Sequence, residues 1–133
     1  MSVTSMTGLR DAAGGVEVSV PGFTSGEIIT LKIKRPSLIE MAAQGRIPNP
    51  LMSTAAQLFK SGAKKEINEM SDGDKFKELA EAIHCVVKAA LVEPSYEELT
   101  NNGVELTDVQ LLYIYDYVQT GIDQLKSIIK KKT

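Results

Sequence analysis

Two adjacent residues, His84 and Cys85, are of the types that form a nucleophile and its base in cysteine-dependent enzymes. A reactive thiolate needs that base within hydrogen-bond reach. The surrounding segment, residues 74–92, has helical periodicity, and residues one apart on a helix point about 100° away from each other. The spacing therefore predicts two helix residues at the edge of the core and argues against a catalytic pair.

The segment SDGD, residues 71–74, places two carboxylates around a glycine, as a calcium-binding loop does. It lacks the further oxygen ligands and the bidentate glutamate at the twelfth position, so we interpret it as the loop before a helix. The single cysteine excludes an internal disulfide, no Cys and His cluster has zinc spacing, and the glycines form no phosphate-binding pattern. The sequence predicts a protein that is not an enzyme and has no cofactor and no metal.

The length of 133 residues favours one domain, and the chain has enough Leu, Ile, Val and Phe to bury a core. We predict a mainly α fold: a single small domain over residues 16–133, with about four helices, a long C-terminal helix and an N-terminal β-hairpin. Residues 1–15 are small, polar and aperiodic, and they are expected to form a flexible arm.

Alternating apolar and polar residues predict the β-hairpin over residues 16–34, with the turn-rich sequence PGFTSG between its strands. An isolated two-stranded hairpin is marginal in water and leaves two open edges, so another element is expected to cover it.

A helical elbow is predicted over residues 37–62, where two short helices follow each other closely. Ser37 is the expected N-cap of the first helix and Gly45 its stop. Asn49 is expected to cap the second helix, with Pro50 at its first position. Residues 62–74 are polar and are predicted to form a loop.

Two longer helices are predicted over residues 74–92 and 107–131, separated by an acidic loop. In the first, the apolar face is Phe76, Leu79, Ala80, Ile83, Val87, Ala90 and Leu91. In the second, Thr107 and Gln110 have the spacing of a capping box. Its apolar stripe steps by four and three residues through Leu111, Tyr115, Val118, Ile122, Leu125 and Ile129.

This stripe either packs inside the domain or forms a helix contact between subunits. Because the hairpin edges and the stripe offer more surface than one small domain hides easily, we expect a homo-oligomer. The candidate oligomer or client surface comprises Ile29, Leu31, Ile33, Leu111, Tyr115, Val118 and Ile122.

The 15 basic and 17 acidic residues give a net charge of −2, which is a poor match for a phosphate backbone, so nucleic acid is not an expected partner. Residues 89–125 contain seven acidic residues and no basic one. These acids are either the solvated faces of helices or a docking surface for a basic partner. With neither a membrane-length apolar stretch nor the start of a signal peptide, the sequence predicts a soluble intracellular protein without a membrane partner.

The most distinctive run is KRPSLIEMAAQGRIPNPLMSTAAQLF, residues 34–59. It resembles the tail assembly chaperones of long-tailed bacteriophages, in the branch found in phages and prophages of Gram-positive bacteria. The similarity extends over about residues 27–133. The matching residues are Arg35, Pro36, Ser37, Leu38, Gly45, Arg46, Ile47, Pro48, Asn49, Pro50, Leu51, Leu58 and Phe59.

The resemblance implies a non-catalytic protein of the host bacterial cytoplasm that is absent from the mature virion. Its partners would be the tape measure protein, which it keeps soluble, and the major tail tube protein, whose subunits it recruits. The candidate contact residues are Arg35, Pro36, Ser37, Arg46, Ile47, Pro48, Asn49, Pro50 and Leu51. The backbone geometry of the elbow explains several of them equally well.

Two alternatives to the chaperone are a small excisionase-like DNA-binding protein and a structural tail or connector subunit that stays in the virion. A helix followed by Gly, a basic residue and Pro is typical of the excisionase-like protein. Such a domain also needs a basic segment after that turn to bind DNA phosphates, and residues 47–63 supply only Lys60.

Three consecutive lysines, Lys130, Lys131 and Lys132, precede Thr133, the last residue of the sequence. They either complement the negative end of a helix dipole or, because consecutive lysine codons can be slippery, mark a ribosomal frameshift. The resembled family commonly makes a longer form in this way, so a frameshift-extended form of the chain is a further expected partner.

Overall fold

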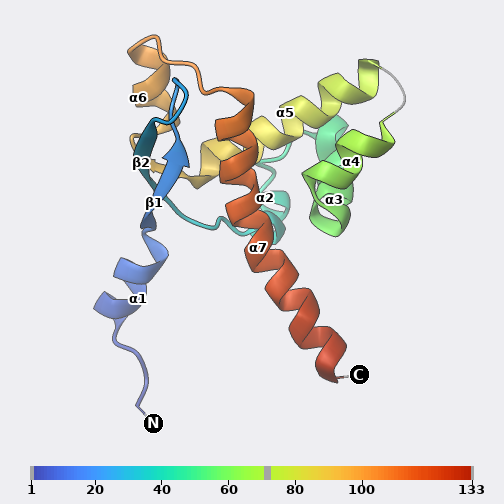
Figure 1. The fold of residues 1–133 in the computed structure, drawn as a ribbon. Helices are drawn as coiled ribbons and strands as arrows, with labels where there is room; N and C mark the ends of the chain where they lie inside the picture. Colours follow the sequence, from blue (N-terminus) through green and yellow to red (C-terminus); the bar gives the residue numbers. More distant parts are fainter. Residues whose placement is uncertain (1, 71–72, 133) are drawn as a thin grey trace.

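The computed structural model describes residues 2–70 and 73–132 and, within the last helix, side chains as far as Asp123. This part of the chain forms seven α-helices, one 3-10 helix and a small antiparallel sheet (Figure 1). The helices are α1 (Met6–Ala13), α2 (Leu38–Ala43), η1 (Asn49–Leu51), α3 (Met52–Ser61), α4 (Ala63–Glu69), α5 (Gly73–Ala90), α6 (Tyr96–Asn101) and α7 (Asp108–Lys132). The prediction of a mainly α fold is confirmed, with more helices than the four or so expected.

The predicted hairpin forms from β1 (Val16–Pro21) and β2 (Ile28–Ile33), which pair from Val16 with Ile33 to Pro21 with Ile28. The turn closes where the Gly22 amide donates to the Glu27 carbonyl at 2.7 Å. A third strand, β3 (Leu91–Glu93), pairs with the other side of β2. The expectation that another element covers the hairpin is confirmed for one of its edges, because the chain leaving α5 pairs with β2.

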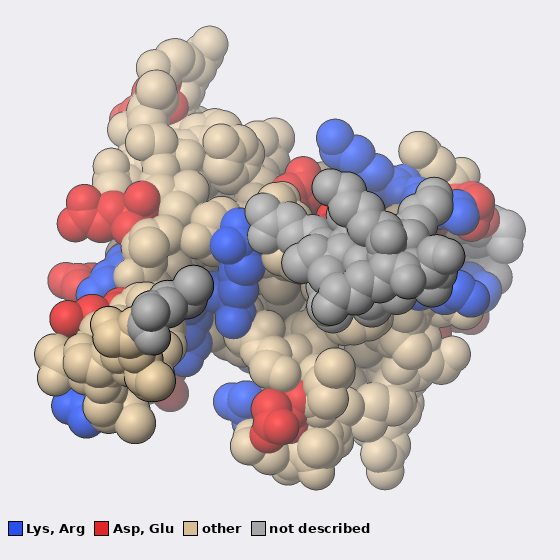
Figure 2. Space-filling view, turned by 90° about the horizontal axis from the view of Figure 1, so that it is seen from below, with Lys and Arg blue, Asp and Glu red and all other residues tan. Residues whose placement is uncertain are grey.

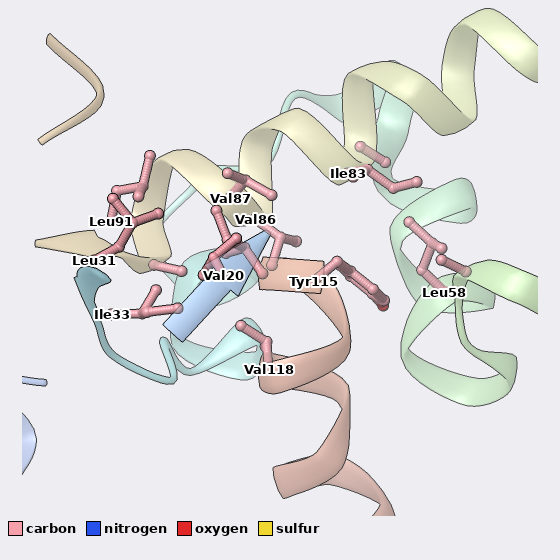
Figure 3. Close-up of a cluster of buried hydrophobic side chains, with 14 of the residues drawn as sticks. Val20, Leu31, Ile33, Leu58, Ile83, Val86, Val87, Leu91, Tyr115 and Val118 are labelled. Atoms are coloured by element: carbon pink, nitrogen blue, oxygen red, sulfur yellow. The ribbon is translucent and has the colours of Figure 1, made fainter. Parts of the chain in front are cut away.

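The core lies between the hairpin, α5 and α7 (Figure 3). Val20, Leu31 and Ile33 of the sheet face Val86 and Val87 of α5, and all five side chains are buried. Tyr115 and Val118 of α7 close the same cluster, and Leu58 extends it to α3. The apolar faces predicted for the two long helices thus meet each other and the sheet.

Several predicted helix ends are confirmed by hydrogen bonds. The Ser37 hydroxyl accepts from the Glu40 amide at 3.1 Å, and Gly45 has the positive φ of 71° that lets the chain turn after α2. The capping box of α7 also forms. The Gln110 amide donates to the Thr107 hydroxyl at 3.2 Å, and the Thr107 amide donates to Gln110 Oε1 at 2.9 Å.

Other predicted boundaries are wrong. Residues 6–13 of the expected flexible arm form α1, and residues 63–69 of the expected loop form α4. The acidic loop contains α6, where Ser95 and Glu98 make a complete capping box. Leu91 to Glu93 form β3 rather than the end of a helix. In each case a short element satisfies backbone groups that a loop would leave to water.

Two residues assigned to the apolar face of α5 point outward: Phe76 is 54% exposed and Ala80 is exposed. The calcium-like segment begins with Ser71 and Asp72, which lie outside the described residues, as do the side chains of Leu125, Ile129 and the terminal lysines.

Candidate functional site

The residues of the distinctive motif build a shallow groove beside α5. Residues 46–51 form one wall and the outer face of α5 forms the other, around a volume of about 560 Å³. The lining residues are Arg46, Pro48, Leu51, Ala80, Glu81, His84, Cys85 and Lys88. We call this the elbow groove.

Part of the motif is buried beneath the groove and holds the elbow in place. Ile47 and Leu51 are 5% and 7% exposed and pack with Met41 of α2 in a cluster that also contacts Cys85 and Ala89 of α5. Burying apolar side chains of this size contributes about 1.5–3 kcal/mol each. Ile47 therefore acts through packing, whereas Leu51 both packs in this cluster and forms part of the groove lining.

The other part of the elbow faces outward. Arg46, Pro48, Asn49 and Pro50 are all exposed. Asn49 does not cap the second helix as predicted. Pro48 holds the N-cap position with φ −56° and ψ 138°, no side chain caps the helix, and Asn49 is the first residue of η1. The fixed φ of Pro48 explains the difference, because an extended proline already supplies the turn into the helix.

Charged and polar groups surround an apolar floor in the elbow groove. Arg46 and Lys88 are basic groups at its edge, and Glu81 is the acidic group among the lining residues. Lys88 Nζ lies 4.8 Å from the centre of the Tyr96 ring, which also meets the His84 ring edge-on at 5.7 Å. The groove can accept a short apolar segment flanked by acidic groups.

His84 and Cys85 are half-buried in the walls of the groove, as expected for residues at the edge of the core. The Cys85 thiol donates to the Arg46 carbonyl at 3.7 Å and so links α5 to the elbow. Among the side chains that the structure describes, no group of three or more His, Cys, Asp or Glu could hold a metal ion.

Arg35, the first of the residues that match the family pattern, reaches away from the groove to α7. Its Nε donates to the Tyr117 carbonyl at 2.9 Å, and its guanidinium lies 4.1 Å from the centre of the Tyr117 ring. A Cβ added at Gly121 would lie 2.7 Å from Arg35 Cδ, so the missing side chain at this glycine makes room for the arginine. Pro36 and Ser37 then line a cavity of about 270 Å³ beside Ile122.

The predicted oligomer or client surface is largely buried inside the domain. Leu31, Ile33, Tyr115 and Val118 are 5%, 0%, 0% and 2% exposed and belong to the core, so they cannot contact another subunit or a client in the folded protein. This prediction is wrong for these four residues, because the domain's own sheet covers the stripe of α7. Ile29, Leu111 and Ile122 are half-buried at its margins.

Two buried glutamines on α7 carry polar contacts that the sequence pattern did not reveal. Gln110 Nε2 donates to the Pro21 carbonyl at 3.0 Å, which joins the start of α7 to the end of β1. The Tyr115 hydroxyl donates to Gln119 Oε1 at 3.0 Å, and Gln119 Nε2 donates to Asp123 at 3.2 Å. Burial raises the pKa of the Tyr115 phenol well above its usual range, and Asp116 and Asp123 raise it further.

The seven acidic residues between positions 89 and 125 are all exposed, on β3, α6, α7 and the connection before α7. Figure 2 shows another face of the molecule, where basic and acidic side chains are interspersed with uncharged surface. No helix in the described part of the chain is long and apolar enough to cross a membrane.

Neither a family model, nor a curated protein, nor a solved structure matches this chain.

Proposed function

We propose that this chain is a tail assembly chaperone of a long-tailed bacteriophage. It binds the tape measure protein, keeps it soluble, recruits tail tube subunits and leaves before the virion is complete. The resemblance of residues 34–59 to that family carries the proposal. The exposed half of the same motif, Arg46 and Pro48 to Pro50, adds support because the packing of the domain does not use these side chains.

The elbow groove is the proposed client site. Its apolar floor and basic edge suit an amphipathic helix whose apolar residues are flanked by carboxylates. The contacts it offers are few and partly polar, which favours reversible binding. A chaperone that must release its client needs binding of this kind.

Co-expression with the tape measure protein of the same genome tests the proposal. We expect the two proteins to co-purify and the soluble fraction of the tape measure protein to increase. Arg46→Glu should weaken the complex, since it reverses a charge at the groove without touching the core. Lys77→Glu makes the same charge change on the exposed surface of α5 outside the groove and should leave the complex intact.

Two outcomes would favour one of the alternative functions, and a third measurement tests the expected longer form of the chain. Tight binding of duplex DNA at low salt, without a tape measure complex, would favour the excisionase-like protein. Detection of the chain in purified virions would favour a structural tail or connector subunit. Mass spectrometry of the phage-producing host would show whether a longer form exists, and its absence would leave the lysines as a helix cap.

A further inference from the structure

The first helix, α1, stands apart from the domain. It has eight residues, none of them buried, and Met6 and Leu9 are 67% and 50% exposed. Val3, which precedes the helix, is 94% exposed. The Ser5 hydroxyl accepts from the Gly8 amide at 3.0 Å and caps its start. Isolated helices shorter than about 12–15 residues are marginal in water, and Gly8 lowers the helix propensity further. A partner surface would therefore stabilise this helix.

The side chains exposed on α1 indicate what kind of partner surface would bind it. Met6, Leu9 and Ala13 share one face, at spacings of three and four residues. Arg10 lies one turn after Met6 at the margin of this face, whereas Asp11 points to the opposite side of the helix. The complementary surface is an apolar groove with an acidic group at its edge.

Such a groove lies at the other end of the domain, between α4, α5 and the start of α7. Ile67, Phe76, Leu79, Leu111 and Leu112 line a cavity of about 240 Å³ together with Asp108. Phe76 is 54% exposed there, and Val109, beside Asp108, is 59% exposed. Asp108 is exposed and can meet a cation such as Arg10. We call this the Phe76 groove.

The chain cannot bring α1 to its own Phe76 groove. Only Gly14 and Gly15 join α1 to β1, and two residues span at most about 7 Å. Gly15 has a φ of 107°, and a Cβ there would lie 2.8 Å from the Ile33 carbonyl oxygen, so the base of α1 is closely packed against β2. Figure 1 shows α1 below the sheet, at the opposite end of the domain from the start of α5. The occupant must come from another molecule.

We propose that α1 of one copy docks in the Phe76 groove of a second copy, with Arg10 beside Asp108. The two surfaces are different, so this contact is heterologous, and each copy keeps a free helix at one end and a free groove at the other. Such contacts produce open chains or closed rings rather than simple dimers. The inference does not depend on the identity of the client.

Sedimentation velocity of the full chain over a concentration series tests this contact. The wild type should grow into larger species as its concentration rises. Leu9→Asp and Phe76→Asp should each raise the dissociation constant at least tenfold, and both positions are solvent-exposed, so the melting temperature should change little. Ile39→Asp, at a position 66% exposed and outside both surfaces, should assemble like the wild type.

Mixing the two defective variants gives the sharpest result. Leu9→Asp retains an intact groove and Phe76→Asp retains an intact helix, so together they should form a 1:1 dimer that grows no further. Arg10→Asp should weaken assembly, and Asp108→Arg in the same chain should restore it. A wild type that stays monomeric up to its solubility limit, or a mixture that does not form the dimer, would overturn the proposal.

Discussion

The buried amide of Gln110 supports a stability prediction that depends on pH. Gln110 is 0% exposed and makes two contacts with different groups. Its Oε1 accepts from the Thr107 amide at 2.9 Å, and its Nε2 donates to the Pro21 carbonyl at 3.0 Å. Gln110→Glu retains the acceptor but replaces the donor by a carboxylate oxygen that faces a carbonyl oxygen. The substitution therefore isolates the contact between α7 and β1.

The size of the effect follows from the lost donor. Leaving a buried carbonyl without its partner costs about 1–3 kcal/mol, and the buried carboxylate adds its own desolvation. At pH 7 we expect Gln110→Glu to lower the free energy of unfolding by about 2–4 kcal/mol. The lost hydrogen bond and the desolvation both favour the protonated acid, because its hydroxyl can donate to the Pro21 carbonyl and it carries no charge. The introduced carboxyl should therefore have a raised pKa in the folded protein.

The sign of the pH dependence follows from that raised pKa. The deficit relative to wild type should be smallest below about pH 4, near the pKa of an unfolded glutamate, and should grow as the pH rises through the folded pKa. Each unit of difference between the two pKa values corresponds to about 1.4 kcal/mol.

Urea unfolding at pH 4 and pH 7, with the wild type measured alongside, gives both quantities. Gln57→Glu is the matched control, because the same change at an exposed position should stay within about 0.5 kcal/mol. A deficit at Gln110 that is equal at both pH values would refute the proposed contact with Pro21.

Three further predictions concern α7, its contacts and α6. Tyr115→Phe should lower the free energy of unfolding by about 1 kcal/mol. The wild type should lose stability above about pH 10, because the Tyr115 phenol ionises in the unfolded chain but keeps its proton in the folded protein, where its pKa is raised. The Phe variant should lack this loss. Urea unfolding at pH 8 and pH 10.5 measures both effects. Gly121→Ala should stabilise the protein by up to about 1 kcal/mol in an Arg35→Ala background. In the wild type the gain should be smaller, because the new methyl group displaces Arg35. Equal gains in the two backgrounds of a double-mutant cycle would exclude the contact between Arg35 and Gly121. Ser95→Ala should cost about 1 kcal/mol and speed amide exchange in α6, and unchanged exchange would show that the capping box is not what holds this helix.

The sequence predicts a helix cap well where the capping residues directly precede a periodic apolar stripe. Thr107 and Gln110 stand directly before a long amphipathic stripe, and their capping box forms as expected. Ser95 and Glu98 have the same spacing, but the segment that follows contains Asn and Gly instead of an apolar run. The capping spacing of Ser95 and Glu98 is therefore a weak predictor of α6, because turn-forming residues follow it and end the helix after six residues.

Periodicity identifies the apolar side of a helix but does not say what covers it. The stripe through Tyr115 and Val118 is compatible with a core and with a subunit interface, and the sheet decides in favour of the core. The decisive contacts join residues about 90 positions apart, such as Gln110 with Pro21. No local pattern contains that information. The exposed face of α1 gives no clear sequence signal, because the few apolar residues of this eight-residue helix form too short a pattern.

The motif that suggests a function also performs two tasks in the fold, and this affects how its residues should be tested. Ser37 caps α2, and Ile47 and Leu51 anchor the elbow to α5, so substitutions there would weaken client binding by destabilising the elbow. Arg46 and Pro48 are exposed, and their side chains are available to a partner. A client site in the elbow groove therefore requires that Arg46→Glu lose the client at unchanged stability. Loss of binding at Ile47 or Leu51 alone would show only that the elbow needs its core.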